Sequence, residues 1–184
     1  MKWASPIDYK LIPTTDSYSF KYMKPGTTGL PLPSHLGAFG VKRRHHSHEG
    51  IDLYCDDGSY VKSVNNGIVL NIVSFTGASM DSPWWEDTMA VLVHTKDGIV
   101  VYGEITPATY LKKGQEIKQG DFIGNVKKVL KEDKGRPMSM LHLELHKCNI
   151  KYHAHCIHPL VEWLPNDPQP ENLLDPTSFL LEAL

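Results

Sequence analysis

The sequence is poor in cysteine, with three in 184 residues. An odd number of cysteines in a chain of this length argues against a disulfide framework. Apolar runs of the roughly 18 to 20 residues that a membrane span needs are also absent. Met1–Pro6 is not followed by an apolar stretch of signal-peptide length. We therefore expect a cytoplasmic protein as the sequence stands, or an exported one if a signal peptide has been removed.

The chain lacks a strong excess of either charge. Its formal net charge is -2 and its pI is near 6.5, so neither nucleic acid nor an anionic membrane is an expected partner. The one local basic cluster, Lys42–Arg44, is interpreted as a solvated loop. With 41% hydrophobic residues, the chain is large enough to bury the core of one globular domain, and no second domain is required.

Turn residues are distributed along the whole chain, with thirteen prolines and fourteen glycines. This distribution favours many short strands joined by turns, and hence an all-β class. Asn65–Gly67, between two apolar runs, predicts one hairpin. Lys96–Gly98 predicts a second, in which Gly98 can adopt the positive φ that the turn demands. Glycines break Lys113–Gly124 into short apolar pieces, which indicates tightly turned β-structure.

The two ends of the chain differ from this regular pattern. Met1–Phe39 is rich in Pro, Gly, Thr and Ser and is expected to be an irregular arm, with one strand over Asp16–Tyr22 where aromatic residues alternate. Asp175, followed by Pro176 and apolar residues, predicts a short C-terminal helix. We expect residues 1–39 to pack as an arm on a core domain of residues 40–184.

Three residues far apart in the sequence are candidate metal ligands. His48 and Asp52 stand four apart, and His142 follows about ninety residues later on a predicted strand, Leu141–Leu145. Imidazole and carboxylate are both good zinc ligands. A site with three protein ligands leaves one tetrahedral position open for water or substrate, which is the arrangement of a catalytic zinc.

The segments around these residues resemble a known family. His48–Asp52, the strand end at Tyr102-Gly103, the glycine turns within Lys113–Gly124 and Leu141–Glu144 are similar in order and spacing to the lysostaphin-like (LytM-type) zinc endopeptidases. The resemblance spans roughly residues 40–145. It implies a small antiparallel β-sheet core with a groove, cleavage of peptide bonds in bacterial cell-wall crosslinks or glycine-rich peptides, and a Zn²⁺ cofactor. It makes His48, Asp52 and His142 the zinc ligands.

Two positions depart from the family pattern. The family has two further histidines that assist catalysis, and here Glu104 and Met140 stand in their places. A methionine cannot transfer a proton. A carboxylate near activated water can act as a base, so Glu104 is the candidate catalytic residue. Without a replacement for the histidines, most activity should be lost, because acid-base assistance is worth about 10² to 10⁴-fold.

Other residues near the motifs are candidates for a supporting role. Because side chains alternate along a strand, Met140, His142, Glu144 and His146 should project to one side. Glu144 is expected to orient His142, and His146 is a second candidate for catalysis. Trp84 and Trp85 could line a substrate groove by stacking on a peptide, or could pack on the core.

A dense Cys/His tract spans Cys148–His158. Its spacing matches none of the paired zinc-site patterns, so a second metal site there is not favoured.

Three functions are considered for a chain with these features. The first is a zinc metallopeptidase acting on cell-wall or small-residue-rich peptides. The second is a catalytically impaired pseudopeptidase that binds zinc and holds a peptide or protein partner in the same groove. The third, a sugar-system phosphocarrier, requires a partner histidine on a paired strand upstream; His35 follows two prolines, which disfavours it.

Overall fold

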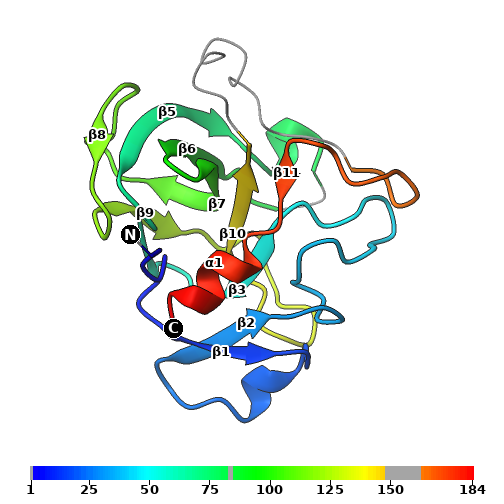
Figure 1. Ribbon diagram of the computed structural model, residues 1–184. Coiled ribbons are helices and arrows are strands. Elements are labelled where there is room, and N and C mark those ends of the chain that lie inside the picture. Colours follow the sequence, from blue (N-terminus) through cyan, green and yellow to red (C-terminus); the bar gives the residue numbers. More distant parts are fainter. Residues whose placement is uncertain (1, 83–84, 148–162) are drawn as a thin grey trace.

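The computed structural model describes residues 2–82, 85–147 and 163–184 (Figure 1). Strands make up most of the regular secondary structure among these residues, so the all-β prediction is confirmed. The strands are β1 (Lys10–Thr14), β2 (Thr27–Pro31), β3 (Ile51–Tyr54), β4 (Tyr60–Lys62), β5 (Gly67–Ser74), β6 (Met89–Thr95), β7 (Gly98–Pro107), β8 (Glu116–Ile117), β9 (Phe122–Val126), β10 (Met140–His146) and β11 (Leu173–Leu174). The helices are two 3₁₀ turns, η1 (Ser19–Lys21) and η2 (Ala78–Met80), and one α-helix, α1 (Thr177–Glu182).

The main sheet is antiparallel, with β10, β7, β6 and β5 adjacent in that order. β3 and β11 both pair with the edge of β10 that β7 leaves free, and β9 joins β4 to β7. β7 and β10 are almost entirely buried, because other strands flank both of their edges and side chains pack on both faces of the sheet. Residues carried by these strands are therefore held by a rigid scaffold.

The second predicted hairpin is confirmed. β6 and β7 pair from Thr95↔Gly98 onward, and Gly98 has φ +135. The expected strand over Leu141–Leu145 is present as β10, and the glycine-rich segment forms β8 and β9. The predicted terminal helix is α1, where the Asp175 carboxylate accepts a hydrogen bond of 2.8 Å from the backbone N–H of Thr177.

The hairpin predicted at Asn65–Gly67 is wrong. β4 pairs with β9, and β5 pairs with β6 and β8. Gly67 begins β5, and an added Cβ would lie 2.4 Å from the His94 carbonyl oxygen. The glycine therefore permits a close approach of two strands instead of forming a turn.

The strand predicted over Asp16–Tyr22 is also wrong. The Asp16 carboxylate accepts the backbone N–H of Tyr18 and starts a turn that leads into the 3₁₀ helix η1. Tyr18, Phe20 and Tyr22 are all exposed, so their alternation reflects no buried face. The alternating aromatic residues suggested a strand, but the hydrogen bond between the Asp16 carboxylate and the backbone determines the local structure.

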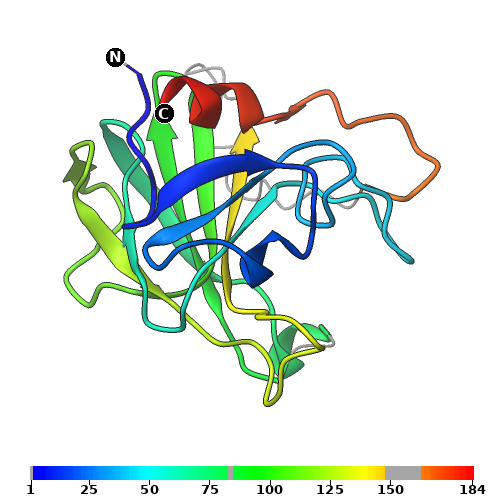
Figure 2. The same ribbon diagram turned by 90° about the horizontal axis from the view of Figure 1, so that it is seen from below.

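The N-terminal segment forms a small sheet of its own. β1 and β2 run parallel, and their Leu11 and Leu30 belong to the main hydrophobic core. The Thr28 hydroxyl donates to the Tyr54 carbonyl oxygen, which joins β2 to β3. Figure 2 shows β1, in dark blue, crossing in front of the main sheet, with α1, in red, above it in the view. The segment thus packs on the core through apolar contacts.

The two chain ends lie close together in both views (Figures 1 and 2). The Trp3 ring stacks on Phe179 of α1 with 4.9 Å between ring centroids, and its indole N–H donates to Asp97 in the β6–β7 turn. Among the described residues, no helix is long and apolar enough to cross a membrane.

Replacing Trp3 with alanine is expected to lower the free energy of unfolding by about 3 to 5 kcal/mol, because the buried ring joins the N-terminal segment to α1 and to the β6–β7 turn. Urea unfolding measures the change. Leu184→Ala, at a residue that is 62% exposed, is the control and should lose less than about 0.5 kcal/mol. A loss below about 1 kcal/mol for Trp3→Ala would show that the two ends contribute little to the fold.

Candidate metal centre and its cavity

The pairing of β3 with β10 brings the three candidate ligands together. Asp52 lies directly opposite His142 across the two strands, and His48 precedes β3 by three residues. Asp52 Oδ1 lies 3.0 Å from His48 Nε2 and 2.9 Å from His142 Nδ1, and the two imidazole nitrogens are 3.3 Å apart. All three residues are buried. One carboxylate oxygen and two ring nitrogens therefore face a single point.

Each imidazole is oriented by a second hydrogen bond on its other nitrogen. His48 Nδ1 donates to the Ala38 carbonyl oxygen at 2.8 Å, and His142 Nε2 donates to Glu144 Oε1 at 2.9 Å. These bonds fix the ring orientations and leave His48 Nε2 and His142 Nδ1 directed at Asp52. Metal-bound histidines in proteins are held in this way by a carbonyl or a carboxylate.

The spacing fits a zinc ion. Ligand atoms about 2.0 to 2.1 Å from a tetrahedral zinc stand about 3.3 Å from one another. The three atoms of this cluster are 2.9 to 3.3 Å apart, and His₂Asp is a donor set that zinc accepts. His48, Asp52 and His142 would hold the ion, with Glu144 and Ala38 orienting the two rings.

The charges of the cluster are strongly coupled. Burial lowers the pKa of His48. Burial has the same effect on His142, but its hydrogen bonds to Asp52 and Glu144 outweigh it and raise the pKa of His142 to about 10. Burial opposes charge on Asp52, yet His48 and Arg43 hold the pKa of that carboxyl well below its usual range. Without metal, His142 is therefore a cation whose Nδ1–H donates to Asp52 and whose Nε2–H donates to Glu144, and this charge takes the place of the metal ion.

Arg43 completes the environment of Asp52, and sequence analysis did not find it. Its guanidinium donates to Asp52 Oδ2 at 2.5 Å and to the Leu36 carbonyl oxygen at 3.1 Å. The interpretation of Lys42–Arg44 as a solvated loop is wrong for this residue, although Lys42 and Arg44 are exposed. Arg43 leaves only Oδ1 of Asp52 free to face the imidazoles.

Glu104 lies in the same cavity on an irregular part of β7. Met89 pairs with Ile105 and Val91 with Tyr102, so two residues of β7 oppose one of β6, which is a β-bulge. Glu104 has φ +60, a left-handed conformation that is costly for this residue type. Its side chain is buried, and Oε2 has no hydrogen-bond partner. Burial and the charge of Asp52 raise the pKa of Glu104 to about 8.

Gly103, the other residue of the bulge, makes room for the site. A Cβ at this position would lie 2.5 Å from the Phe75 ring, whose centroid is 5.4 Å from that of His142. The absence of a side chain at Gly103 lets Phe75 cover one face of the ligand imidazole.

Met140, at the second altered position, lies on β10 opposite Tyr54. It is buried in an apolar cluster with Val129 and Met138. The residue lines the cavity, but it offers neither a donor nor a base.

The other predicted site residues are placed as follows. Glu144 Oε2 lies 2.6 Å from His146 Nε2, so His146 stands behind Glu144 and is not among the residues lining the cavity. Trp85 is 55% exposed, with the Lys131 ammonium 3.6 Å from its ring centroid. Trp84 and the tract Cys148–His158 lie outside the described residues, as does any second metal site there.

The cavity in front of the cluster has a volume of about 530 Å³. Its polar lining includes Arg43, Glu104 and Glu144 beside the candidate metal ligands, and its apolar lining includes Phe75 and Met140. This size is within the range of sites for small organic or peptide ligands.

The family model of peptidase family M23 matches residues 46–155, well over half of the chain. The chain belongs to this family. The match confirms the resemblance to lysostaphin-like peptidases, and it includes His48, Asp52, Glu104 and His142. M23 peptidases are metal-dependent, which agrees with the ligand cluster.

Several solved structures are similar to this chain. The catalytic domain of the antimicrobial peptidase lysostaphin from Staphylococcus simulans is 16% identical, with a TM-score of 0.50 over 78% of this chain and 89% of that one. Csd3 from Helicobacter pylori is 21% identical, with a TM-score of 0.49 over 80% of this chain and 32% of that one. This chain thus spans about a third of the length of Csd3. CbpA from L. salivarius REN is 22% identical, with a TM-score of 0.48 over 80% and 85%.

No curated protein matches the sequence closely enough to be counted as a relative.

Binding of zinc to the metal-free protein at pH 7 is expected to release about one proton, because His142 holds its proton at every pH below about 10 and the metal must displace it. His48, whose pKa is lowered, has no proton to give up at this pH. Zinc affinity should therefore rise about tenfold per pH unit between pH 7 and 9. Calorimetry in buffers of different ionisation enthalpy measures the released proton. No release at pH 7 would contradict the proposed charge state of the cluster.

Proposed function

We propose that this protein is a zinc-dependent peptidase that hydrolyses peptide bonds in bacterial cell-wall crosslinks or in other peptides rich in small residues. The observation that carries the proposal is the β-bulge that turns Glu104 into the cavity of the His48, Asp52 and His142 cluster. A strained residue persists only where the surrounding structure holds it, and such residues cluster at functional sites. Membership of family M23 supports the reaction class.

The chemistry divides between the metal and the chain. A zinc ion held by the cluster would polarise water and stabilise the negative charge that develops on the substrate carbonyl oxygen. Peptide hydrolysis also needs a group that takes a proton from water and delivers one to the leaving amine. Glu104 is suited to this role, because its Oε2 is in the cavity wall and has no partner within the protein. Arg43 and Glu144 keep the ligands in position.

Replacing Glu104 with glutamine is expected to lower kcat by about 10² to 10⁴-fold, because the amide has the same size but cannot accept the proton. Zinc content should be unchanged, since Glu104 is not a ligand. Hydrolysis of peptidoglycan and of pentaglycine by the zinc-loaded protein, measured by mass spectrometry of the products, tests this. Glu116→Gln, at an exposed residue of β8, is the matched control. Equal rates for Glu104→Gln and the native chain would remove Glu104 from the mechanism.

One observation favours a second candidate, a pseudopeptidase that binds zinc and holds a peptide without cleaving it. Met140 occupies a position where the family has a catalytic histidine, and its packing against Val129 and Met138 integrates it into an apolar cluster. Of the two altered positions, only Glu104 then carries a group that can transfer protons. Under this alternative the groove binds a peptide or protein partner, and no product forms.

The combined change Glu104→His and Met140→His separates the two candidates. If the native chain is a pseudopeptidase, the doubly substituted protein should gain hydrolysis of the same peptides by at least about 10²-fold over the native background. Robust turnover by the native protein would eliminate the alternative. Met138→His beside Met140 is the control for adding an imidazole to this cluster, and it should bring no gain.

A further inference from the structure

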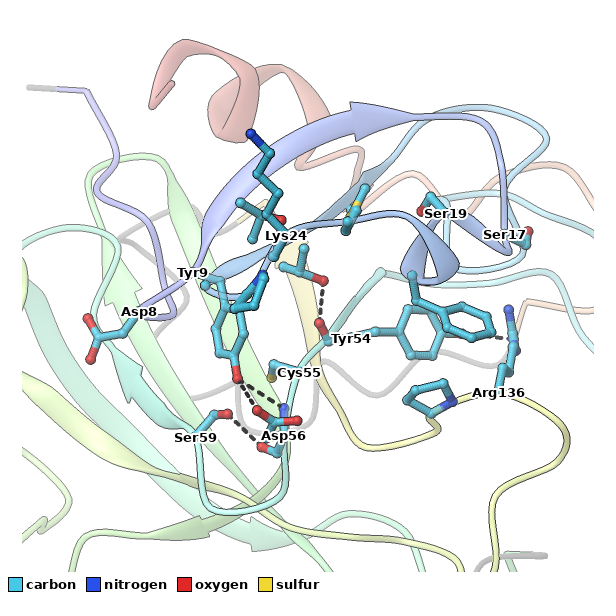
Figure 3. Close-up of a pocket in the computed structure, with 18 of the residues that line it drawn as sticks. Asp8, Tyr9, Ser17, Ser19, Lys24, Tyr54, Cys55, Asp56, Ser59 and Arg136 are labelled. Carbon is cyan, nitrogen blue, oxygen red and sulfur yellow. Dashed lines mark hydrogen bonds between the residues drawn. The ribbon is translucent and has the colours of Figure 1, made fainter.

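A second cavity adjoins the metal cavity. Its volume is about 660 Å³, and it lies between the N-terminal segment and the end of β3 (Figure 3). Two residues, Tyr54 and Arg136, line both cavities. Tyr54 and Arg136 therefore stand at the boundary between the two hollows.

The guanidinium of Arg136 is incompletely satisfied. Its Nη2 donates to the Tyr54 hydroxyl at 3.0 Å, and the group lies 5.0 Å from the Tyr54 ring centroid. Nη1 is buried and has no hydrogen-bond partner. Within the described part of the chain, no carboxylate forms an ion pair with Arg136. A buried donor without an acceptor is costly, so an acceptor supplied by a ligand would be favourable.

Arg43, the other arginine of the metal cavity, differs in this respect. Its charge is matched by Asp52, and both its described hydrogen bonds are made within the protein. Of the two guanidinium groups lining that cavity, Arg136 alone keeps an unmatched positive charge among the described residues.

The second cavity has charge of the opposite sign at its far side. Figure 3 shows Tyr54 and Arg136 on one side and Tyr9 with Asp56 on the other. The Tyr9 hydroxyl donates to the Asp56 carboxylate at 2.5 Å. A negative group on a ligand would therefore be attracted to the Arg136 side and repelled from the Asp56 side.

Strand geometry relates Arg136 to the metal centre. Asp52 and Tyr54 are two residues apart on β3 and point to the same side, which separates their Cα atoms by about 6.6 Å. An extended peptide covers a similar distance in about two residues. A substrate bound at the metal would thus bring a group two or three residues from its reacting bond to Arg136.

We propose that Arg136 recognises a carboxylate of the ligand at the junction of the two cavities, so that the site selects peptides with a free carboxylate a few residues from the bond at the metal. A modest rotation of the long side chain would direct both Nη1 and Nη2 to the two oxygens, which is the paired geometry that guanidinium and carboxylate favour. The inference rests on the proposed function for the position of the peptide, but it concerns binding and does not require cleavage.

Two pairs of peptides distinguish the sources of the carboxylate. Pentaglycine and its C-terminal amide test a chain end, and the acetylated amides Gly-Gly-Glu-Gly-Gly and Gly-Gly-Gln-Gly-Gly test a side chain. Calorimetry with the zinc-loaded Glu104→Gln protein measures affinity without hydrolysis. The protein should bind the acid member of at least one pair about tenfold or more tightly than its neutral partner.

The variant Arg136→Gln should abolish this preference while leaving the affinity for the neutral peptides unchanged, and Arg136→Lys should retain part of it. Arg44→Gln, at an exposed arginine outside both cavities, is the matched control and should keep the preference in full. Equal affinities for acid and neutral peptides in both pairs, or a preference that survives Arg136→Gln, would overturn the inference.

The outcomes also separate this inference from the proposed function. A chain that binds acid peptides through Arg136 but never cleaves them supports the inference and contradicts the peptidase. Cleavage that does not distinguish acid from amide peptides supports the peptidase and contradicts the inference.

Discussion

The site depends on one carboxylate oxygen. Asp52 Oδ1 lies within 3.0 Å of both imidazoles, and everything around it keeps that oxygen in place. The β3–β10 register puts Asp52 opposite His142, and Arg43 holds the second oxygen. Burying a carboxylate is costly unless positive charge and hydrogen bonds compensate it. A proton on His142 supplies that compensation in the metal-free chain, and a bound cation would supply it in its place. The cluster is thus preorganised for a metal.

The two positions that depart from the family are physically different. Met140 is an ordinary apolar residue in an apolar cluster, and its environment needs nothing else. Glu104 is the opposite case, because a left-handed backbone, deep burial and an unpartnered oxygen are each unfavourable for a glutamate. A fold that needed only stability would not place a carboxyl group there. This contrast explains why the proposed function assigns proton transfer to Glu104 and none to Met140.

Much of the site could be predicted because its signals are local. His48, Asp52 and His142 stand in short motifs, and the alternation on β10 already placed Glu144 beside His142. Arg43 could not be found, because a basic loop segment reads as solvated and the bond to Asp52 depends on how that loop folds over β3. The bulge at Glu104 arises from the pairing of β6 with β7, which no local pattern encodes. Gly67 and Asp16 show the same limit for the fold. The glycine that lets two strands approach closely looks like a hairpin turn in sequence, and the turn that begins at Asp16 looks like a strand.

The central claim is that His48, Asp52 and His142 together bind zinc and leave a coordination position open. X-ray absorption at the zinc edge of the stoichiometrically loaded protein tests it most directly. We predict two imidazole ligands and oxygen ligands at about 2.0 to 2.1 Å, with one imidazole lost in His48→Ala and the spectrum changed by a small competing ligand such as azide. Sulfur at about 2.3 Å, or a spectrum unaffected by His48→Ala, would show that the metal is held elsewhere and would contradict the account.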